Sequence, residues 1–301
     1  MGMGLMAVRS PKRVGLGLLA ITIAAALWAI AAIVARQLFD AGVTPFQLAW
    51  GRSAIAAVGL GAVSLGRGGF RWRIDGRVLA LGLSLGLVTA SYYVAIARIS
   101  VSAAVVIQYM APALVVLWTA FRNRKRPSLA VGMAVLLALL GVAMISGLGD
   151  QDLRLDSIGL MAAGLSALFF SSYTLLSESL VHQLGATGVM FRGFFISSLF
   201  WLAYLVPQGP SMLLFQPAHF PSLLFVGIAG TLVPFSLMCW GIQQMSAERG
   251  AIAATLEPVL AALFAWLWLN QSLSLTQILG SVLVLMAVTA LQSRKLTNPQ
   301  I

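Results

Sequence analysis

The sequence predicts an all-α polytopic membrane protein, from its composition, its long apolar runs and an internal repeat. The chain has 301 residues, of which 60% are hydrophobic and only 9% are charged, and its mean hydropathy is +0.95. Soluble globular domains do not have that balance. In lipid, only helices and closed barrels satisfy every backbone polar group, and the residue alternation of a barrel is missing from this sequence. The apolar runs are therefore expected to be transmembrane helices.

Ten apolar segments follow one another along the chain, and their connections are too short to hold a soluble domain. At ~1.5 Å rise per residue, about 20 residues cross a hydrocarbon core of ~30 Å. The first segment is longer than the ~7–15 apolar residues of a signal peptide, so we expect it to remain as a membrane anchor. The segments are 14–36, 45–66, 78–98, 101–121, 128–147, 157–179, 187–206, 222–243, 250–270 and 273–292.

The basic residues predict the orientation of these segments. With ten spans, 14 of the 19 Lys and Arg residues fall on one side of the membrane and three on the other, while Arg52 and Arg192 lie inside segments. An excess of Lys and Arg marks cytoplasmic loops. Both termini are therefore expected to be cytoplasmic. The net charge of +11 has the same origin, and no nucleic-acid partner is expected.

An internal repeat relates the two halves of the chain. A shift of 146 residues places Ala111-Pro112 on Glu257-Pro258, with four identities in the 22 positions that begin at Tyr93. A shift of 140 places Arg52 on Arg192. The repeating unit is then five helices, and an odd unit makes its second copy enter the membrane from the opposite side. Inverted halves around a central cavity are typical of secondary transporters. The expected halves are residues 1–148 and 157–301, joined by the acidic loop 149–156.

Three stretches resemble the EamA-type repeats of the drug/metabolite transporter superfamily. They are ALWAIAAIVARQLFDAGVTPFQLAWGRSAIA in the first half, and AIAATLEPVLAALFAWLW followed by LSLTQILGSVLVLMAV in the second. The resemblance implies a ten-helix exporter whose cavity is formed by helices 1, 3, 4, 6, 8 and 9. Within the family, the chain is most similar to the YddG-type amino-acid exporters of bacterial inner membranes. It departs from the family where members often carry Gly-Glu, because it has Asn270-Gln271 there and the basic run Arg122 to Arg126 in the first half.

Glu257 is the principal candidate for a transport site. It lies near the middle of the ninth segment, where a carboxylate costs at least a few kcal/mol unless it is neutral, paired or hydrated. Pro258 follows and is expected to kink or open the helix. The carboxylate could bind a substrate ammonium group or carry a proton. Alternatively it pairs with an arginine such as Arg192, or caps the carbonyls that Pro258 frees.

Arg52 and Arg192 form a second pair of candidates. The planar guanidinium of either could bind a substrate carboxylate. Alternatively both fasten their helices to neighbouring backbone carbonyls. We favour the structural role, because helices 2 and 7 do not line the cavity in the family that the chain resembles.

Several polar and aromatic side chains in other segments could complete the site. Aromatic walls suit apolar and amphipathic substrates, but Tyr and Trp are also common anchors at membrane interfaces. Each of these residues therefore has a structural alternative. The candidates are Gln108, Tyr109 and Pro112 on the fourth segment, Tyr93 beside Tyr92 on the third, Tyr173 with Ser166 and Phe170 on the sixth, Trp28 on the first and Trp240 on the eighth.

Other chemistry finds little support. Residues 82–86 match the G-x-S-x-G motif of serine hydrolases, but that motif needs a strand–turn–helix, and we expect these glycines to pack helices instead. The sequence has no P-loop motif, and one cysteine with two separated histidines makes no metal cluster. We therefore expect no catalytic residue, no metal and no cofactor.

The sequence thus predicts an alternating-access secondary transporter. The resemblance implies that it exports amino acids, including aromatic ones, and related small metabolites from the cytoplasm across a bacterial inner membrane, and we expect a monomer. The proton is a candidate coupling ion, and uniport fits equally well. Alternatives with the same fold are drug, sugar or nucleotide-sugar efflux carriers. Alternatives of other classes are an intramembrane serine hydrolase that uses Ser84 and a membrane scaffold without a cavity.

Overall fold

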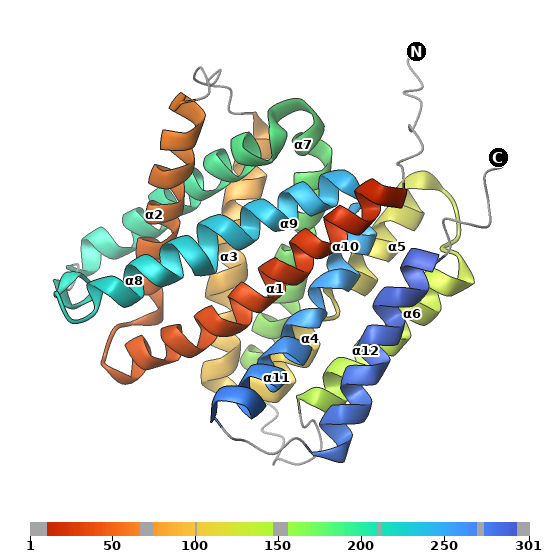
Figure 1. Ribbon diagram of the computed structural model, residues 1–301. Helices are drawn as coiled ribbons and strands as arrows, with labels where there is room; N and C mark the ends of the chain where they lie inside the picture. Colours follow the sequence, from red (N-terminus) through yellow and green to blue (C-terminus); the bar gives the residue numbers. More distant parts are fainter. Residues whose placement is uncertain are drawn as a thin grey trace.

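The computed structural model describes residues 11–66, 75–99, 101–146, 156–209, 212–269 and 274–293. All regular structure in these ranges is helical, and the helices form a single bundle (Figure 1). Six of the described helices are long and apolar enough to cross a membrane: Arg13–Asp40, Pro45–Gly66, Gly76–Ala95, Ala103–Asn123, Ser157–Gln208 and Phe220–Gln244. The prediction of an all-α membrane protein is confirmed at this level.

The helices follow the predicted segments, with breaks inside several of them. The fourth, eighth and ninth segments are each divided, whereas the sixth and seventh form one stretch that breaks only at Gly185, with φ 68° and ψ 161°. The helices are α1 Pro11–Asp40, α2 Pro45–Gly66, α3 Gly76–Arg98, α4 Val101–Gln108, α5 Ala111–Asn123, α6 Leu129–Ile145, α7 Ser157–Leu205, α8 Phe220–Gly227, the π-helix η3 Ile228–Leu232, α9 Val233–Gln244, α10 Ala247–Ala254, α11 Leu256–Leu269 and α12 Leu275–Ser293, with short 3₁₀ turns η1 Val206–Gln208 and η2 Met212–Phe215.

Helix positions in the two halves share a common spacing. The shift that places Ala111 on Glu257 also places the start of α6 on that of α12. It places Ser128 on Ser274 as well, and each of these serines accepts a hydrogen bond from the backbone N–H three residues later, as helix N-caps do. The shift that places Arg52 on Arg192 likewise places the start of α2 on the break at Gly185. Both shifts found in the sequence therefore recur in the helix boundaries.

Glycines allow close approach of two helix pairs. In α3, a Cβ added at Gly82 would overlap Ile196 of α7, and one at Gly86 would lie 3.1 Å from Phe200. The expectation that residues 82–86 pack helices is confirmed. The helices α6 and α12 lie side by side (Figure 1). There, a Cβ added at Gly141 would lie 2.5 Å from the Gly280 carbonyl oxygen, and one at Gly280 2.6 Å from the Gly141 carbonyl oxygen.

The outer surface carries large apolar side chains that would be unfavourable in water. Val58 is 74% exposed, Phe121 79%, Leu129 87% and Leu275 71%. Exposed apolar surface on this scale marks a contact with lipid or with another apolar partner. Together with the length of the helices, it identifies a multi-pass membrane protein.

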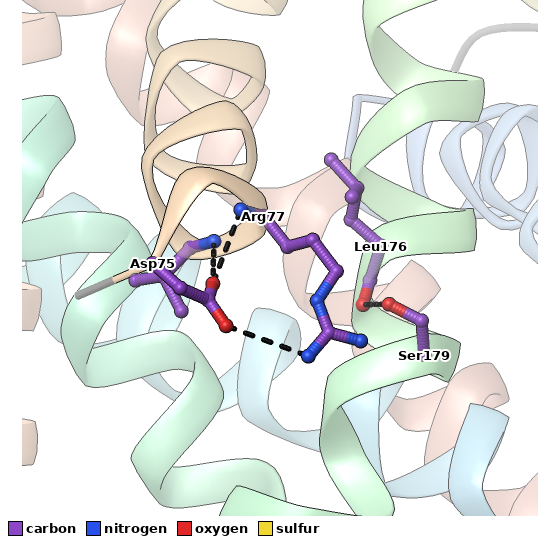
Figure 2. A network of polar contacts seen from close by, with 5 residues as sticks. Asp75, Arg77, Leu176 and Ser179 are labelled. Atoms are coloured by element: carbon purple, nitrogen blue, oxygen red, sulfur yellow. Dashed lines mark hydrogen bonds and ion pairs between the residues drawn. The ribbon is translucent and has the colours of Figure 1, made fainter. Parts of the chain in front are cut away.

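The start of α3 is fixed by a polar cap outside the apolar span. The Asp75 carboxylate accepts hydrogen bonds from the backbone N–H groups of Arg77 and Val78, at 3.1 and 3.0 Å, and its second oxygen lies 3.4 Å from the Arg77 guanidinium. Figure 2 shows the Arg77 side chain reaching past this cap toward α7, where the Ser179 hydroxyl donates to the Leu176 carbonyl oxygen. The bond from Val78 and the Arg77 charge lower the pKa of Asp75 below its ordinary value.

Candidate functional site

The helix that contains Glu257 is broken immediately before it. Helix α10 ends at Ala254 and α11 begins at Leu256, with Thr255 between them. Pro258 explains this position, because a proline lacks an N–H and its ring clashes with the carbonyl four residues earlier, here that of Ala254. The Thr255 hydroxyl and its backbone N–H both donate to the Ile252 carbonyl oxygen, at 2.6 and 3.1 Å. The predicted helix break beside the acid is confirmed.

The first half has a matching break, which the sequence analysis did not predict. Residues 101–121 were expected to form one helix, but α4 ends at Gln108 and α5 begins at Ala111. Tyr109 and Met110 occupy the break, and Pro112 is at the start of α5, where a proline is well tolerated. Pro112 and Pro258 occupy equivalent positions in the repeat, so both breaks have the same local cause.

A hydrogen bond joins the two breaks. The Tyr109 hydroxyl donates to Oε2 of Glu257 at 2.8 Å. Tyr109 is buried, with 8% of its surface exposed, and a carboxylate removed from water needs such partners to offset its lost hydration. The sequence suggested Arg192 as a partner for Glu257. In the structure, Arg192 Nη1 donates instead to the Gly188 carbonyl oxygen one turn back in α7, at 2.9 Å.

Three further side chains interact electrostatically with the Glu257 carboxylate. They are Tyr92 of α3, Tyr173 of α7 and Arg52 of α2. Tyr93 completes the group, because it interacts electrostatically with the Arg52 guanidinium. We call these four residues, together with Tyr109 and Glu257, the central polar cluster. Four of its members, Glu257, Tyr93, Tyr109 and Tyr173, were proposed from the sequence as binding candidates. For Arg52, the sequence analysis favoured a structural role.

An aromatic group adjoins the central polar cluster. Phe235 of α9 lies at its centre, with ring centroids 5.1 Å from Trp28 and 5.8 Å from Tyr173, and the Arg52 guanidinium carbon lies 5.7 Å from its ring centroid. A cation at this distance from an aromatic ring is attracted by its electrons. Phe194 packs against the same ring, at 5.2 Å. Trp28 and Tyr173, both candidates from the sequence, thus both contact Phe235.

Phe235 was missed by the sequence analysis, although a signal was present. It follows Pro234, and the π-helix η3 ends just before it. A proline in an apolar segment disturbs the helix before it, and π-helical turns occur often at functional sites. The Thr231 hydroxyl donates to the Val226 carbonyl oxygen at 2.8 Å, which satisfies part of the disturbed backbone. The Val-Pro-Phe sequence could therefore have indicated this position.

Two buried polar atoms beside Phe235 have no hydrogen-bond partner in the described part of the chain. They are Trp28 Nε1 and the Tyr173 hydroxyl oxygen. Buried donors of this kind are rarely left unsatisfied in proteins. Both therefore are positions at which a polar ligand atom or a water molecule would be stabilised.

The remaining candidates lie at other positions. Trp240 is on an exposed face of α9, with 36% of its surface exposed, as expected for an aromatic residue in contact with lipid. Gln108 is half-buried at the end of α4, and Pro112 and Pro258 are buried at the breaks. Ser84 is buried within α3, so it lacks the strand–turn–helix of a nucleophile elbow. Among the described residues, no group of three or more His, Cys, Asp or Glu side chains could hold a metal ion.

Comparison with known proteins then decides the family. The model of the EamA-like transporter family matches residues 15–147 and, a second time, residues 157–291. The chain belongs to the EamA-like transporter family. The resemblance to EamA repeats is thereby confirmed, and the protein is a membrane transporter of a family that is not an enzyme class.

Relatives of this EamA protein are named as transporters. It is 26% identical over 290 residues to the "uncharacterized inner membrane transporter YicL" of Salmonella typhimurium, covering 93% of this chain and 96% of that one. It is 28% identical over 191 residues to the "uncharacterized transporter YcbK" of Bacillus subtilis, where the match spans 62% of this chain and 61% of the relative. It is 25% identical over 210 residues to the threonine/homoserine exporter RhtA of Salmonella typhimurium, over 70% of this chain and 68% of RhtA.

The fold is also found in a solved structure. A crystal structure with 20% sequence identity matches with a TM-score of 0.78 and covers 94% of this chain and 99% of its own. At that identity the likeness shows the fold alone.

Proposed function

We propose that this EamA transporter exports amino acids and related small metabolites by alternating access, with Glu257 in the substrate site. The observation that carries the proposal is the hydrogen bond from Tyr109 to Glu257, which joins two broken helices from opposite halves of the chain. A carboxylate at a helix break within an apolar bundle has a high free-energy cost, and such residues usually serve transport.

The proposed topology has ten spans in two inverted halves of five. In the first half these are α1, α2, α3, α4 with α5, and α6. In the second they are α7 as two spans divided at Gly185, then α8 to α9, α10 with α11, and α12. The spacing shared by the helix starts supports equivalent halves, and an odd number of spans in each gives them opposite orientations. With the charge bias of the loops, both termini are cytoplasmic. A relative named as an inner membrane transporter supports a bacterial inner membrane, where we propose a monomer.

In the proposed cycle, the two halves rock about the central polar cluster. The breaks at Tyr109 and Thr255 interrupt the regular helices and provide local freedom near the middle of the bundle. A substrate ammonium group would replace the Tyr109 hydroxyl as the partner of Glu257. In its absence a proton could neutralise the same carboxylate, so that Glu257 is also the proposed site of proton coupling.

Two observations favour amino acids as substrates. The relative RhtA is named as a threonine/homoserine exporter, and the cluster offers an acidic group beside aromatic rings. The rings of Trp28, Tyr173 and Phe235 suit apolar and aromatic side chains, which supports a broad specificity that extends to aromatic amino acids.

Transport by the purified protein in liposomes would test this function. We expect saturable counterflow of labelled L-threonine or L-phenylalanine above that of protein-free liposomes. Sugars and nucleotide sugars serve as comparison substrates, and we expect no flux of either. Flux of those compounds without flux of any of the common twenty amino acids would overturn the amino-acid assignment. The absence of all flux would overturn the transport site itself.

A further inference from the structure

Arg52 and Arg192 occupy equivalent places in the sequence but have different surroundings. Arg192 is buried, with 4% of its surface exposed, and donates a hydrogen bond to a carbonyl of its own helix. Arg52 is half-buried, its guanidinium lies against the ring of Phe235, and it interacts electrostatically with Tyr93. The structural role expected for both arginines is thus visible in the contacts of Arg192, whereas Arg52 reaches the residues around Glu257.

The contacts of Arg52 do not neutralise its charge. A guanidinium has five N–H donors in a planar fork that matches the two oxygens of a carboxylate. In the described part of the chain, no Asp or Glu forms a salt bridge with Arg52. Instead its guanidinium lies against the aromatic face of Phe235 and interacts electrostatically with Tyr93, and neither residue neutralises its charge. A half-buried cation of this kind is costly in a membrane unless it has a partner for part of the cycle.

Glu257 likewise has no group of opposite charge in direct contact with it in the described part of the chain. Its only hydrogen bond in the described structure comes from the neutral Tyr109 hydroxyl, which offsets part of the lost hydration but none of the charge. Arg52 interacts with Glu257 electrostatically, without the contact of a salt bridge. The cluster therefore presents one positive and one negative group that are close together but not directly paired.

On the basis of the proposed function, we infer that the substrate is a zwitterion whose ammonium group binds Glu257 and whose carboxylate binds Arg52. Such a ligand neutralises both groups and carries no net charge across the bilayer, which avoids most of the cost of moving an ion. Tyr93 positions the Arg52 fork, and the substrate side chain packs against Phe235. The unpartnered Trp28 Nε1 and Tyr173 hydroxyl are placed to meet a polar group on that side chain.

Analogues that lack one charge at a time test this assignment. Labelled L-threonine and L-phenylalanine are taken up into proteoliposomes, with the free amino acid, its carboxamide and its 2-hydroxy acid as unlabelled competitors. For the wild-type protein we expect the free amino acid to compete at least about tenfold better than either analogue, because each analogue leaves one charged group of the site unpaired.

Substitutions should then remove the two preferences separately. We expect Arg52→Gln to abolish discrimination between acid and amide while it keeps discrimination between amine and hydroxy acid, and Glu257→Gln to do the reverse. Arg192→Gln is the matched control and should change neither ratio. Arg52→Lys keeps the charge without the planar fork, so it should retain part of the acid preference even if Arg52→Gln folds poorly, which gel filtration would reveal.

The outcomes separate this inference from the proposed function. Two results would overturn the role of Arg52 and leave amino-acid transport intact. One is wild-type flux that the free amino acid and its carboxamide inhibit equally. The other is an Arg52→Gln variant in which inhibition by every competitor weakens to the same extent. Absence of amino-acid flux in the wild-type protein would overturn both.

Discussion

The two broken helices have the same backbone feature but carry different chemistry. In the first half, α4 and α5 are separated by Tyr109 and Met110, and in the second, α10 and α11 are separated by Thr255. A proline follows each break at equivalent positions. The position equivalent to Glu257 is Ala111, and the position equivalent to Tyr109 is Thr255.

This difference shows how a duplicated scaffold gains an asymmetric site. The prolines disturb both helices in the same way, and the capping serines of α6 and α12 recur in both halves. The carboxylate and the phenol do not recur, and the hydrogen bond between Tyr109 and Glu257 connects the unlike members. We therefore expect scaffold substitutions to have matched effects in the two halves and site substitutions to have unmatched ones.

Removal of the charge at the second break should have the largest effect. We expect Glu257→Gln to lower amino-acid flux at least about tenfold, as loss of a charged group from a polar site usually does, and Ala111→Gln at the first break to affect flux much less. Initial rates in proteoliposomes at several substrate concentrations would measure both. Glu248→Gln, in the first turn of α10, is the control for loss of one carboxylate elsewhere. Wild-type flux from Glu257→Gln would contradict the proposed site.

The glycines of α6 and α12 should be equally sensitive in the two halves. In Gly141→Ala and Gly280→Ala, the new Cβ would lie 2.5–2.6 Å from the facing carbonyl oxygen, and the helices must separate. Overpacking of this kind costs about 1–3 kcal/mol. Thermal unfolding in detergent should show similar losses for both. Gly164→Ala, which meets nothing within 4 Å, is the control and should be neutral or stabilising. Very unequal losses would contradict the reciprocal contact of the two glycines.

Loss of the hydroxyl at the first break should cost less. Tyr109→Phe keeps the ring but leaves the Glu257 carboxylate without its hydrogen bond. Because that carboxylate is only half-buried, we expect a loss near the lower end of the about 1–3 kcal/mol that an unsatisfied buried group costs. If the substrate ammonium replaces this hydroxyl, the same substitution should lower the KM for amino acids, because the substrate no longer competes with Tyr109. Tyr204→Phe, on an exposed part of α7, controls for loss of a hydroxyl. An increased KM would mean that Tyr109 assists binding.

The sequence predicted the local features of this fold better than the contacts between distant segments. Pro258 acts on its own helix, so the break beside Glu257 could be located, and the glycines of residues 82–86 indicated close packing without naming the partner. The break at Tyr109 was missed although Pro112, which the repeat places on Pro258, could have indicated it in the same way.

The partners within the site depended on tertiary packing. Tyr109 and Glu257 are 148 residues apart, and nothing in either segment specifies their pairing. Phe235 is one apolar residue in an apolar helix, so periodicity gives it no distinction. The choice between Arg52 and Arg192 likewise rested on how α2 and α7 face the bundle, which the sequence does not contain.

The smallest expected effect is on the pH dependence of stability, where the charged N-cap Asp75 is compared with the uncharged N-caps Ser128 and Ser274. Because the Val78 N–H bond and the Arg77 charge lower the pKa of Asp75 in the folded protein, its cap stabilises α3 above the pKa of the unfolded chain, and this contribution is lost as the pH falls through the lower folded value. Ser128 and Ser274 cap α6 and α12 through hydroxyl groups, which do not titrate in this range. In Asp75→Ser, the cap should survive while unfolding below the ordinary aspartate pKa of 3.8 becomes less dependent on pH. The effect is small because Asp75 faces solvent, and an unchanged pH profile in this variant would show that the cap bonds alone, and not the charge, hold the start of α3.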